Sequence, residues 1–201
     1  MKRDPVVQID LAVAILKNGG VVAFPTDTVY GLGAAVDNPA AIRRIFQIKN
    51  RPLSQPMPLL LADPVQAETV AFDIPDLAWE FMAEFWPGAL TLVLKKAAWV
   101  PDVLTAGSPN VAQRVPDYAI TISLIEGVGV PLVGTSANLH GRPAPSTADE
   151  VRQQLEGKVD FILDGGRVPG VESTIIDLTV IPPRILREGA VSRAEIEKHL
   201  I

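Results

Sequence analysis

Hydrophobic and polar residues repeat along this chain with two periods, one typical of helices and one typical of buried strands. Helical spacing predicts helices over residues 8–18, 39–48, 64–71, 75–85, 117–126, 147–155 and from 192 onwards. Short apolar runs predict strands over residues 21–24, 58–62, 90–94, 111–115, 130–134, 161–163, 174–178 and 184–186. Several neighbouring strands are joined by links too short for a crossover helix, so we expect an α/β fold with a mixed sheet.

Capping residues support several of the helix boundaries. The signals are a Gly19-Gly20 stop, an Asn38-Pro39 start, and two capping boxes formed by Thr147 with Glu150 and by Ser192 with Glu195. The aromatic residues within 75–85 recur at helical spacing, which indicates core packing. Residues 97–109 lose this periodicity and contain proline, glycine and serine, so we expect a long loop there that can lie over a site as a lid.

Length and composition are those of a globular protein. The 201 residues are 48% hydrophobic and 20% charged, which argues against disorder and is met most simply by one compact domain over 1–201. Polar residues interrupt the N-terminal apolar run, so it does not fit a secretory signal, and no stretch approaches a membrane span. We therefore expect a soluble cytoplasmic protein.

The composition also removes several kinds of chemistry. Cysteine is absent, which excludes disulfides, thiolate catalysis and cysteine zinc sites. His140 and His199 are the two histidines of the chain, so we expect no metal site built on imidazole. The formal net charge is −5, so any site for an anion or a nucleic acid must be a local cluster of arginine and lysine.

The polar stretch FPTDTVYGLG, residues 24–33, follows the first predicted strand. Thr26, Thr28 and Tyr30 alternate, so an extended backbone places them on one face, while Gly31 and Gly33 permit a turn or the close approach of a ligand. We interpret the stretch as the wall of a binding site. An ordinary loop rich in turn-forming residues explains the same ten residues equally well.

Cations and small polar residues follow or interrupt other apolar elements. Lys49 and Arg51 come at the end of a predicted helix, where they either compensate the helix dipole or bind phosphate. The tetrad Thr135-Ser136-Ala137-Asn138 ends a strand, where ligands bind in open α/β sheets, although it also fits a turn. Arg114 lies inside a strand, and can face solvent or hold a carboxylate. There is no Walker motif and no GxGxxG, so the residues themselves predict an anion-binding α/β protein and no more.

Seven motifs occur in an order that resembles one known family. They are FPTDTVYGLG, the helix leading to KNRP, WPGALTLVL, VAQRVPD, GTSANLHGRPAPST, ESTIID and ILREGA. Over nearly its whole length the chain resembles the threonylcarbamoyl-AMP synthase family, the YrdC-like domain. The resemblance implies a twisted open mixed sheet with flanking helices and a concave ligand cleft. It also implies a nucleotidyltransferase that condenses L-threonine, bicarbonate and ATP, with Mg²⁺ on the phosphates, to threonylcarbamoyl-adenylate and pyrophosphate.

The resemblance also implies a role for individual residues. The implied threonine-binding residues are Thr28, Arg114, Ser136 and Ser173, with Arg114 pairing the substrate carboxylate. The implied nucleotide-binding residues are Lys49, Arg51, Gln55, Asn110, Asn138, Ser146 and Arg187, of which Lys49 and Arg51 are also assigned to catalysis. Because Lys49 and Arg51 follow the apolar stripe of their helix, we expect their replacement by alanine to abolish turnover and leave stability nearly unchanged.

The chain departs from the family pattern in a few places. Leu60 stands where many relatives have a histidine, so a contact to threonine is lost or replaced, and Gln55 stands where an asparagine is frequent. Longer members of the family add a C-terminal domain, and we expect this chain to be the single-domain form.

The implied product is passed to a transferase that modifies adenosine next to the anticodon of certain tRNAs. Two other readings stay open. One is a related module that binds tRNA or double-stranded RNA directly and has no synthase activity. The other is a paralogue that acts on a different carbamoyl species, against which the absence of acylphosphatase and zinc-finger segments speaks.

Overall fold

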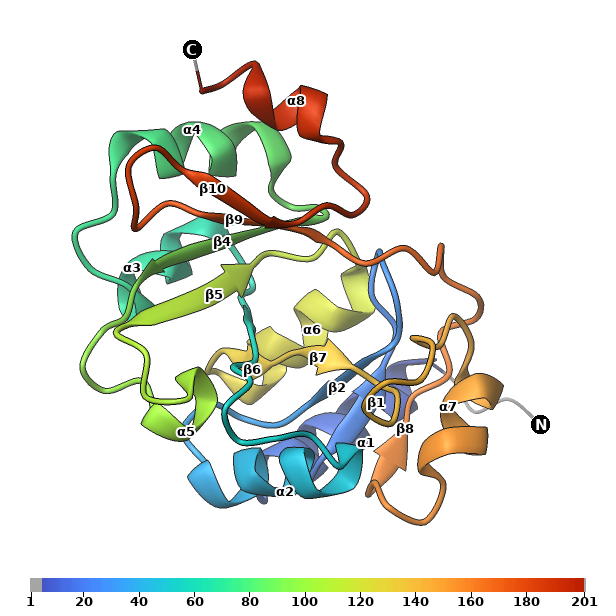
Figure 1. Ribbon diagram of the computed structural model, residues 1–201. Coiled ribbons are helices and arrows are strands. Elements are labelled where there is room, and N and C mark those ends of the chain that lie inside the picture. The colour runs from blue at the N-terminus through green and yellow to red at the C-terminus, as the bar shows by residue number, and fades with distance from the viewer. Residues whose placement is uncertain (1–4, 201) are drawn as a thin grey trace.

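The computed structural model describes residues 5–200, and residues 1–4 and 201 of the expected domain lie outside the described part. The helices, with the 3-10 turn η1, are α1 (Pro5–Lys17), α2 (Pro39–Lys49), η1 (Pro64–Gln66), α3 (Ala67–Val70), α4 (Asp76–Phe85), α5 (Asp102–Thr105), α6 (Ala119–Val128), α7 (Ala148–Leu155) and α8 (Arg193–Glu197) (Figure 1). The strands are β1 (Val22–Phe24), β2 (Gly31–Gly33), β3 (Leu59–Leu60), β4 (Leu90–Lys95), β5 (Asn110–Arg114), β6 (Leu132–Val133), β7 (Thr135–Ser136), β8 (Phe161–Ile162), β9 (Thr174–Asp177) and β10 (Arg184–Arg187).

These strands form two mixed sheets. The smaller has the order β7-β2-β1-β8, and the larger has the order β10-β9-β4-β5-β3-β6. In the smaller sheet β1 is parallel to β8 and antiparallel to β2, and in the larger β4 is parallel to β9 and antiparallel to β5. The mixed α/β class is confirmed. The single open sheet is replaced by two, because the chain leaves the larger sheet after β6 and enters the smaller one at β7, with Gly134 between them.

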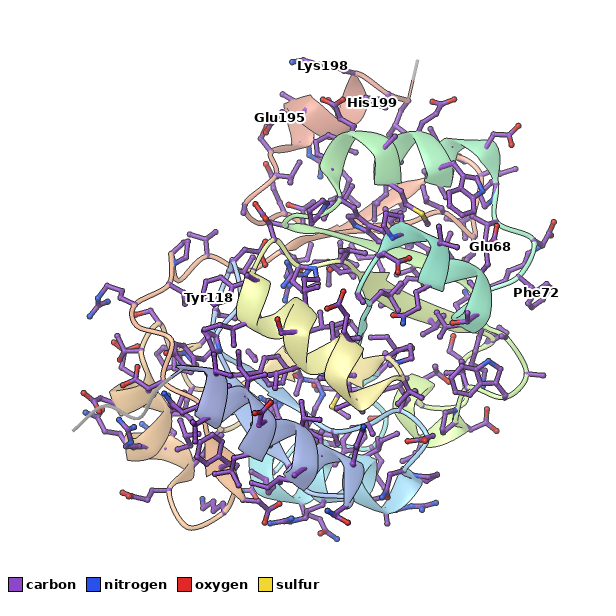
Figure 2. The ribbon with its side chains drawn as sticks, turned by 180° about the vertical axis from the view of Figure 1, so that it is seen from behind. Glu68, Phe72, Tyr118, Glu195, Lys198 and His199 are labelled. Carbon is purple, nitrogen blue, oxygen red and sulfur yellow. The ribbon has the colours of Figure 1, made fainter. Side chains whose placement is uncertain are left out.

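Helices bury both faces of the smaller sheet. On one face α1 and α6 lie side by side, as Figure 2 shows from behind, and Leu16 and Leu124 belong to the same buried cluster as Phe24 of β1. On the other face α2 packs Ile42 into a cluster that contains Ala23 of β1. Neighbouring residues of β1 therefore point into different cores, which explains why its sequence is continuously apolar rather than alternating.

Most of the predicted helix boundaries are confirmed. Gly19 follows α1 with a φ of 79°, a conformation that glycine adopts without strain. The Oδ1 atom of Asn38 accepts a hydrogen bond of 3.0 Å from the amide of Ala41 at the start of α2. Ser192 and Glu195 form the complete capping box at α8. Local side-chain chemistry was therefore a sound guide to where these helices begin and end.

Two local expectations need correction. Thr147 caps α7, but the Glu150 carboxylate accepts its backbone hydrogen bond, 2.7 Å, from the amide of Ser146 and not from Thr147. Residues 97–109 are not a structureless lid, because they contain α5, which packs against α2. Strands β2 and β7 were not predicted at all.

Gln113 of β5 is a polar side chain buried in the larger sheet. It is fully buried, and neither its side-chain nitrogen nor its oxygen has a hydrogen-bond partner among the described residues. A buried amide without partners costs stability, and methionine has a similar shape without the polar atoms. Gln113→Met should therefore raise the free energy of unfolding by about 1 kcal/mol, measured in urea.

Gln66 provides the matched control, because its side-chain oxygen accepts a 2.9 Å hydrogen bond from the amide of Ala62. The same replacement there, Gln66→Met, should lower stability. If Gln113→Met also lowered the free energy of unfolding, the side-chain amide of Gln113 would have to stabilise the folded protein.

Candidate active site

A cavity lies between the two sheets, at the end of β5 that carries Arg114. It is lined by Thr26, Thr28, Val29, Gly31, Arg51, Pro56, Pro58, Leu60, Thr91, Arg114, Gly134, Thr135, Ser136, Glu172, Ser173, Ile175 and Arg187. Its volume is about 160 Å³. Pockets for drug-sized ligands hold about 300–1,000 Å³, so the enclosed part suits a small molecule, and a larger ligand must extend through the opening.

Arg114 is the buried cation of this cavity, with 5% of its surface exposed. Its Nη1 atom donates 2.6 Å to the Asp27 carboxylate and 3.0 Å to the carbonyl of Gly88, and its Nη2 atom donates 3.2 Å to the Thr28 hydroxyl. Because the guanidinium is held from three directions, its orientation is fixed before any ligand arrives. The strand arginine therefore faces the cavity and not solvent.

The hydroxyls beside Arg114 form a directed hydrogen-bond chain. Thr26 donates 2.7 Å to the carbonyl of Val29, so in the 2.8 Å contact between the Thr26 and Thr28 hydroxyls Thr28 is the donor. Thr28 in turn accepts from Arg114. Across the cavity, the hydroxyls of Thr91 and Ser173 lie 2.9 Å apart. These groups offer a ligand polar contacts without adding charge.

Arg51 and Arg187 add positive charge at the cavity. The Nη1 atom of Arg187 lies 3.1 Å from the Glu172 carboxylate, and its Nη2 atom donates 2.8 Å to the carbonyl of Ser173. Arg51 donates 2.9 Å to the carbonyl of Pro56, and burial together with the nearby Arg187 lowers the pKa of its guanidinium. Two guanidinium groups this close to each other attract an anion placed between them.

Lys49 does not line the cavity. Of the charged residues that the structure describes it is the most deeply buried, with 1% of its surface exposed. Its Nζ atom donates to the carbonyls of Ser136 and Asn138, the latter at 2.7 Å. Burial, assisted by the Arg51 charge, lowers its pKa to about 7. Lys49 is thus buried and not exposed past the end of its helix, so we expect Lys49→Ala to lower stability, because the carbonyls of Ser136 and Asn138 would lose this donor.

Four other predicted residues also lie outside the cavity lining. They are Gln55, Asn110, Asn138 and Ser146. Asn110 begins β5 and donates 2.9 Å to the Thr179 hydroxyl, at the far end of the strand from Arg114. Ser146 is held by Glu150 and by Arg167, whose Nη1 atom donates 2.9 Å to its hydroxyl. The geometry brings together six of the predicted residues: Thr28, Arg51, Arg114, Ser136, Ser173 and Arg187.

The stretch 24–33 forms part of the cavity wall, as expected, through Thr26, Thr28, Val29 and Gly31, but Tyr30 and Gly33 have other roles. Tyr30 is fully buried and donates 2.7 Å to the carbonyl of Gly166, so it anchors a neighbouring loop and does not line the cavity. Gly31 and Gly33 form β2 rather than a turn. A side chain at Gly33 would meet the carbonyl of Val133 at 2.4 Å, so close packing between strands is what requires glycine there.

Asp27, Thr91 and Glu172 take part in the site but were not predicted. Asp27 stands inside the FPTDTVYGLG motif, where the hydroxyls drew attention and the carboxylate did not. Its place next to a strand arginine is set by tertiary contacts, which no local pattern encodes. Glu172 adjoins the predicted Ser173, so an acid next to a binding hydroxyl was the available signal.

The loop of residues 97–109, all of which the structure describes, contributes nothing to the cavity lining. His199, labelled in Figure 2, is also absent from the lining; its ring makes a tilted contact with Phe81 and an edge-on contact with Phe85, at centroid distances of 5.4 and 5.5 Å. Among the described residues there is no cluster of three histidine, aspartate or glutamate side chains that could hold a metal ion.

Leu60 and Gly134 meet at the apolar part of the lining. A Cβ atom at Gly134 would lie 2.3 Å from Cγ of Leu60, with no strained φ to add to the cost. Gly134→Ala should therefore lower the free energy of unfolding by about 1–3 kcal/mol through overpacking, measured in urea. The double variant Gly134→Ala/Leu60→Ala should lose less than the sum of the two single variants. Additive losses would mean that the two residues do not clash.

Comparisons with known proteins decide the family. The family model described as telomere recombination, which covers Sua5, YciO and YrdC, matches residues 14–189. The chain belongs to the Sua5/YciO/YrdC family. The threonylcarbamoyl-AMP synthase of Pyrococcus abyssi is 45% identical over 192 residues, which cover 95% of this chain and 56% of that relative. The threonylcarbamoyl-AMP synthase of Bacillus subtilis is 43% identical over 193 residues, covering 94% and 56%.

A solved structure of the family, P. abyssi Sua5 complexed with L-threonine, matches with a TM-score of 0.93 at 45% identity. The match covers 95% of this chain and 56% of that one, so the chain spans about half the length of these relatives. The resemblance drawn from the seven motifs is confirmed. No helix among the described residues of this Sua5/YciO/YrdC family member is long and apolar enough to cross a membrane.

Proposed function

We propose that this protein is a threonylcarbamoyl-AMP synthase, which condenses L-threonine, bicarbonate and ATP to threonylcarbamoyl-adenylate and pyrophosphate. One observation carries the proposal. A buried, fully oriented arginine, Arg114, lies in a hydroxyl-rich cavity that also carries Arg51 and Arg187. An amino acid and a polyphosphate need this pair of features, and the relatives named above bear the same activity in their names.

In this proposal the cavity takes L-threonine. The Nη1 atom of Arg114 is occupied by Asp27 and Gly88, so the threonine carboxylate approaches Nη2 and the neighbouring hydroxyls of Thr28, Ser136 and Ser173. A charge-assisted hydrogen bond to a buried guanidinium is among the stronger polar contacts a protein can offer. The small volume of the enclosed part favours an amino acid over a larger ligand.

ATP then extends from the opening, with its phosphates against Arg51 and Arg187. Arginine forks suit phosphate oxygens, and both residues are partly exposed. Glu172 is the carboxylate among the described lining residues, and magnesium usually needs only one or two carboxylates besides the phosphates. A magnesium ion that arrives with ATP therefore fits this site, with Glu172 as its protein partner, and would neutralise phosphate charge.

The reaction needs orientation more than it needs a nucleophilic side chain. The threonine amine attacks the carbon of bicarbonate, water leaves, and a carbamate forms. A carbamate oxygen then attacks the α-phosphorus while the bond to pyrophosphate breaks. Arg114 fixes the amino acid, and Arg51 and Arg187 neutralise the charge that develops on the phosphates. The lining residues supply hydroxyls and cations, which fits this division of work.

The product is a mixed anhydride of a carbamate and a phosphate, so it is an activated group donor. We propose that a tRNA-modifying threonylcarbamoyl transferase consumes it. Direct binding of tRNA or double-stranded RNA is not needed for this step, because every substrate of the synthase is a small molecule.

The proposal is tested by pyrophosphate release from ATP and bicarbonate, with and without L-threonine. We expect release that depends on threonine and is much weaker with L-valine, which lacks the hydroxyl. L-alanine serves as a smaller control that keeps the carboxylate and amine. Well-folded protein that releases no pyrophosphate, or releases it without threonine, would exclude the synthase activity.

A further inference from the structure

Lys49 ends α2 with its ammonium in a cage of oxygen atoms. Its Nζ atom donates to the carbonyl of Ser136, to the carbonyl of Asn138 at 2.7 Å, and to Oδ1 of Asn138 at 3.3 Å. An ammonium has three donors, and these three oxygens use all of them. A phosphate could be bound by this lysine only after the cage had opened.

The caged segment lies between the end of α2 and the stretch that carries Thr28. Ser136 pairs with Gly31 of β2, and the amide of Ala137 donates 2.7 Å to the carbonyl of Tyr30 just before that strand. The segment 136–138 is thus bonded to this stretch on one side and to Lys49 on the other. The backbone adds a second link to α2, because the amide of His140 donates 2.8 Å to the carbonyl of Lys49. The segment is therefore held at both edges.

Lys49 is also close to two polar residues of the cavity lining. Ser136, whose carbonyl it holds, lines the cavity, and Arg51, two residues further along the chain, lines it as well. Lys49 itself is absent from the lining. Lys49 therefore lies outside the cavity but is linked to two lining residues, to Ser136 by a hydrogen bond and to Arg51 along the chain.

We infer that Lys49 is a positioning residue, which fixes segment 136–138 against the end of α2 and so sets the place of Ser136 relative to Arg51, and that it does not bind phosphate. The inference rests on the proposed synthase function for its ligands and on the geometry of the cage for its mechanism. A lysine suits this task because a neutral side chain of the same length offers no set of three donors.

The test compares Lys49→Met with Arg44→Met, two variants that each remove one cation from α2; Arg44 pairs with Asp160 and does not line the cavity. L-threonine binding is measured without nucleotide, by calorimetry. We expect Lys49→Met to weaken threonine binding about tenfold or more, because a displaced Ser136 misplaces its contact, and Arg44→Met to leave it unchanged. Lys49→Arg keeps a charge with several donors and should recover part of the affinity.

Amide hydrogen exchange gives a second measurement that needs no ligand. The amides of Ala137 and His140 should exchange faster in Lys49→Met than in wild type, and at an unchanged rate in Arg44→Met. If Lys49→Met does not fold, Asn138→Ala removes one oxygen of the cage. It should speed the same exchange and weaken threonine binding, although Asn138 does not line the cavity.

Unchanged exchange at Ala137 and His140, or threonine affinity equal to wild type with loss of ATP affinity alone, would overturn the inference in favour of a phosphate ligand. Wild-type protein that binds neither threonine nor ATP would overturn the proposed function instead. The exchange measurement still decides the positioning role in that case.

Discussion

Replacing Arg114 by alanine should abolish threonine binding and also destabilise the fold. The guanidinium is a buried donor to the substrate carboxylate, so its loss should cost at least about 2 kcal/mol of binding, or more than about thirtyfold in affinity. It also leaves Asp27 without its cation, since their side chains are 6% and 14% exposed. Breaking such a pair costs about 3 kcal/mol of stability, measured in urea.

The two effects of Arg114→Ala can be separated with a matched pair of variants. Arg114→Met combined with Asp27→Asn removes both charges at once, so it should regain most of the stability but none of the threonine affinity. Threonine affinity that survives in the double variant would show that the carboxylate is bound elsewhere.

Arg51→Met should abolish turnover with little effect on stability. Its side chain is partly exposed, and in the folded protein it donates hydrogen bonds to the carbonyls of Gln55 and Pro56. The loss of these bonds should lower the free energy of unfolding by about 1 kcal/mol. In the proposed reaction it neutralises charge on the transferred phosphate, and the loss of one such group lowers the turnover rate by about 10²–10³. Pyrophosphate release at saturating ATP measures the loss.

Arg44 is a suitable control for this prediction. It also lies on α2, but it pairs with Asp160 at 2.5 Å and is absent from the cavity lining. Arg44→Met should keep wild-type turnover. An equal loss in both variants would point to a general effect of positive charge on α2.

The helix caps were predicted correctly because a cap and its partner are close in the sequence. Asn38 and Ser192 cap helices through side chains a few residues from their partners, so sequence spacing alone encodes the contact. Arg114 and Ser173 were reached through motifs, and the fold brings them to one cavity from the end of β5 and from the residue before β9. Strands β2 and β7 escaped prediction because they are short and rich in glycine or hydroxyls.

Lys49 and Asn110 lie outside the cavity, each for a physical reason. Lys49 follows Ile42 by seven residues and Ile45 by four, so it shares their helix face, and the helical period already indicated burial. We nevertheless expected Lys49 to be exposed, because it is a charged residue at the end of a helix. Asn110 lies four residues from Arg114 in one strand, a separation of about 13 Å at the usual rise per residue, which explains why it does not line the same small cavity; its role in nucleotide binding stays a prediction.

The identity of the nucleotide product decides whether this protein is a threonylcarbamoyl-AMP synthase. The protein is incubated with ATP, L-threonine and ¹³C-bicarbonate, and the nucleotide products are analysed by mass spectrometry. We expect a threonylcarbamoyl-adenylate that carries the ¹³C label, formed in step with pyrophosphate and absent in Arg114→Ala. A threonyl-adenylate without label, or pyrophosphate release with no such adduct, would contradict it.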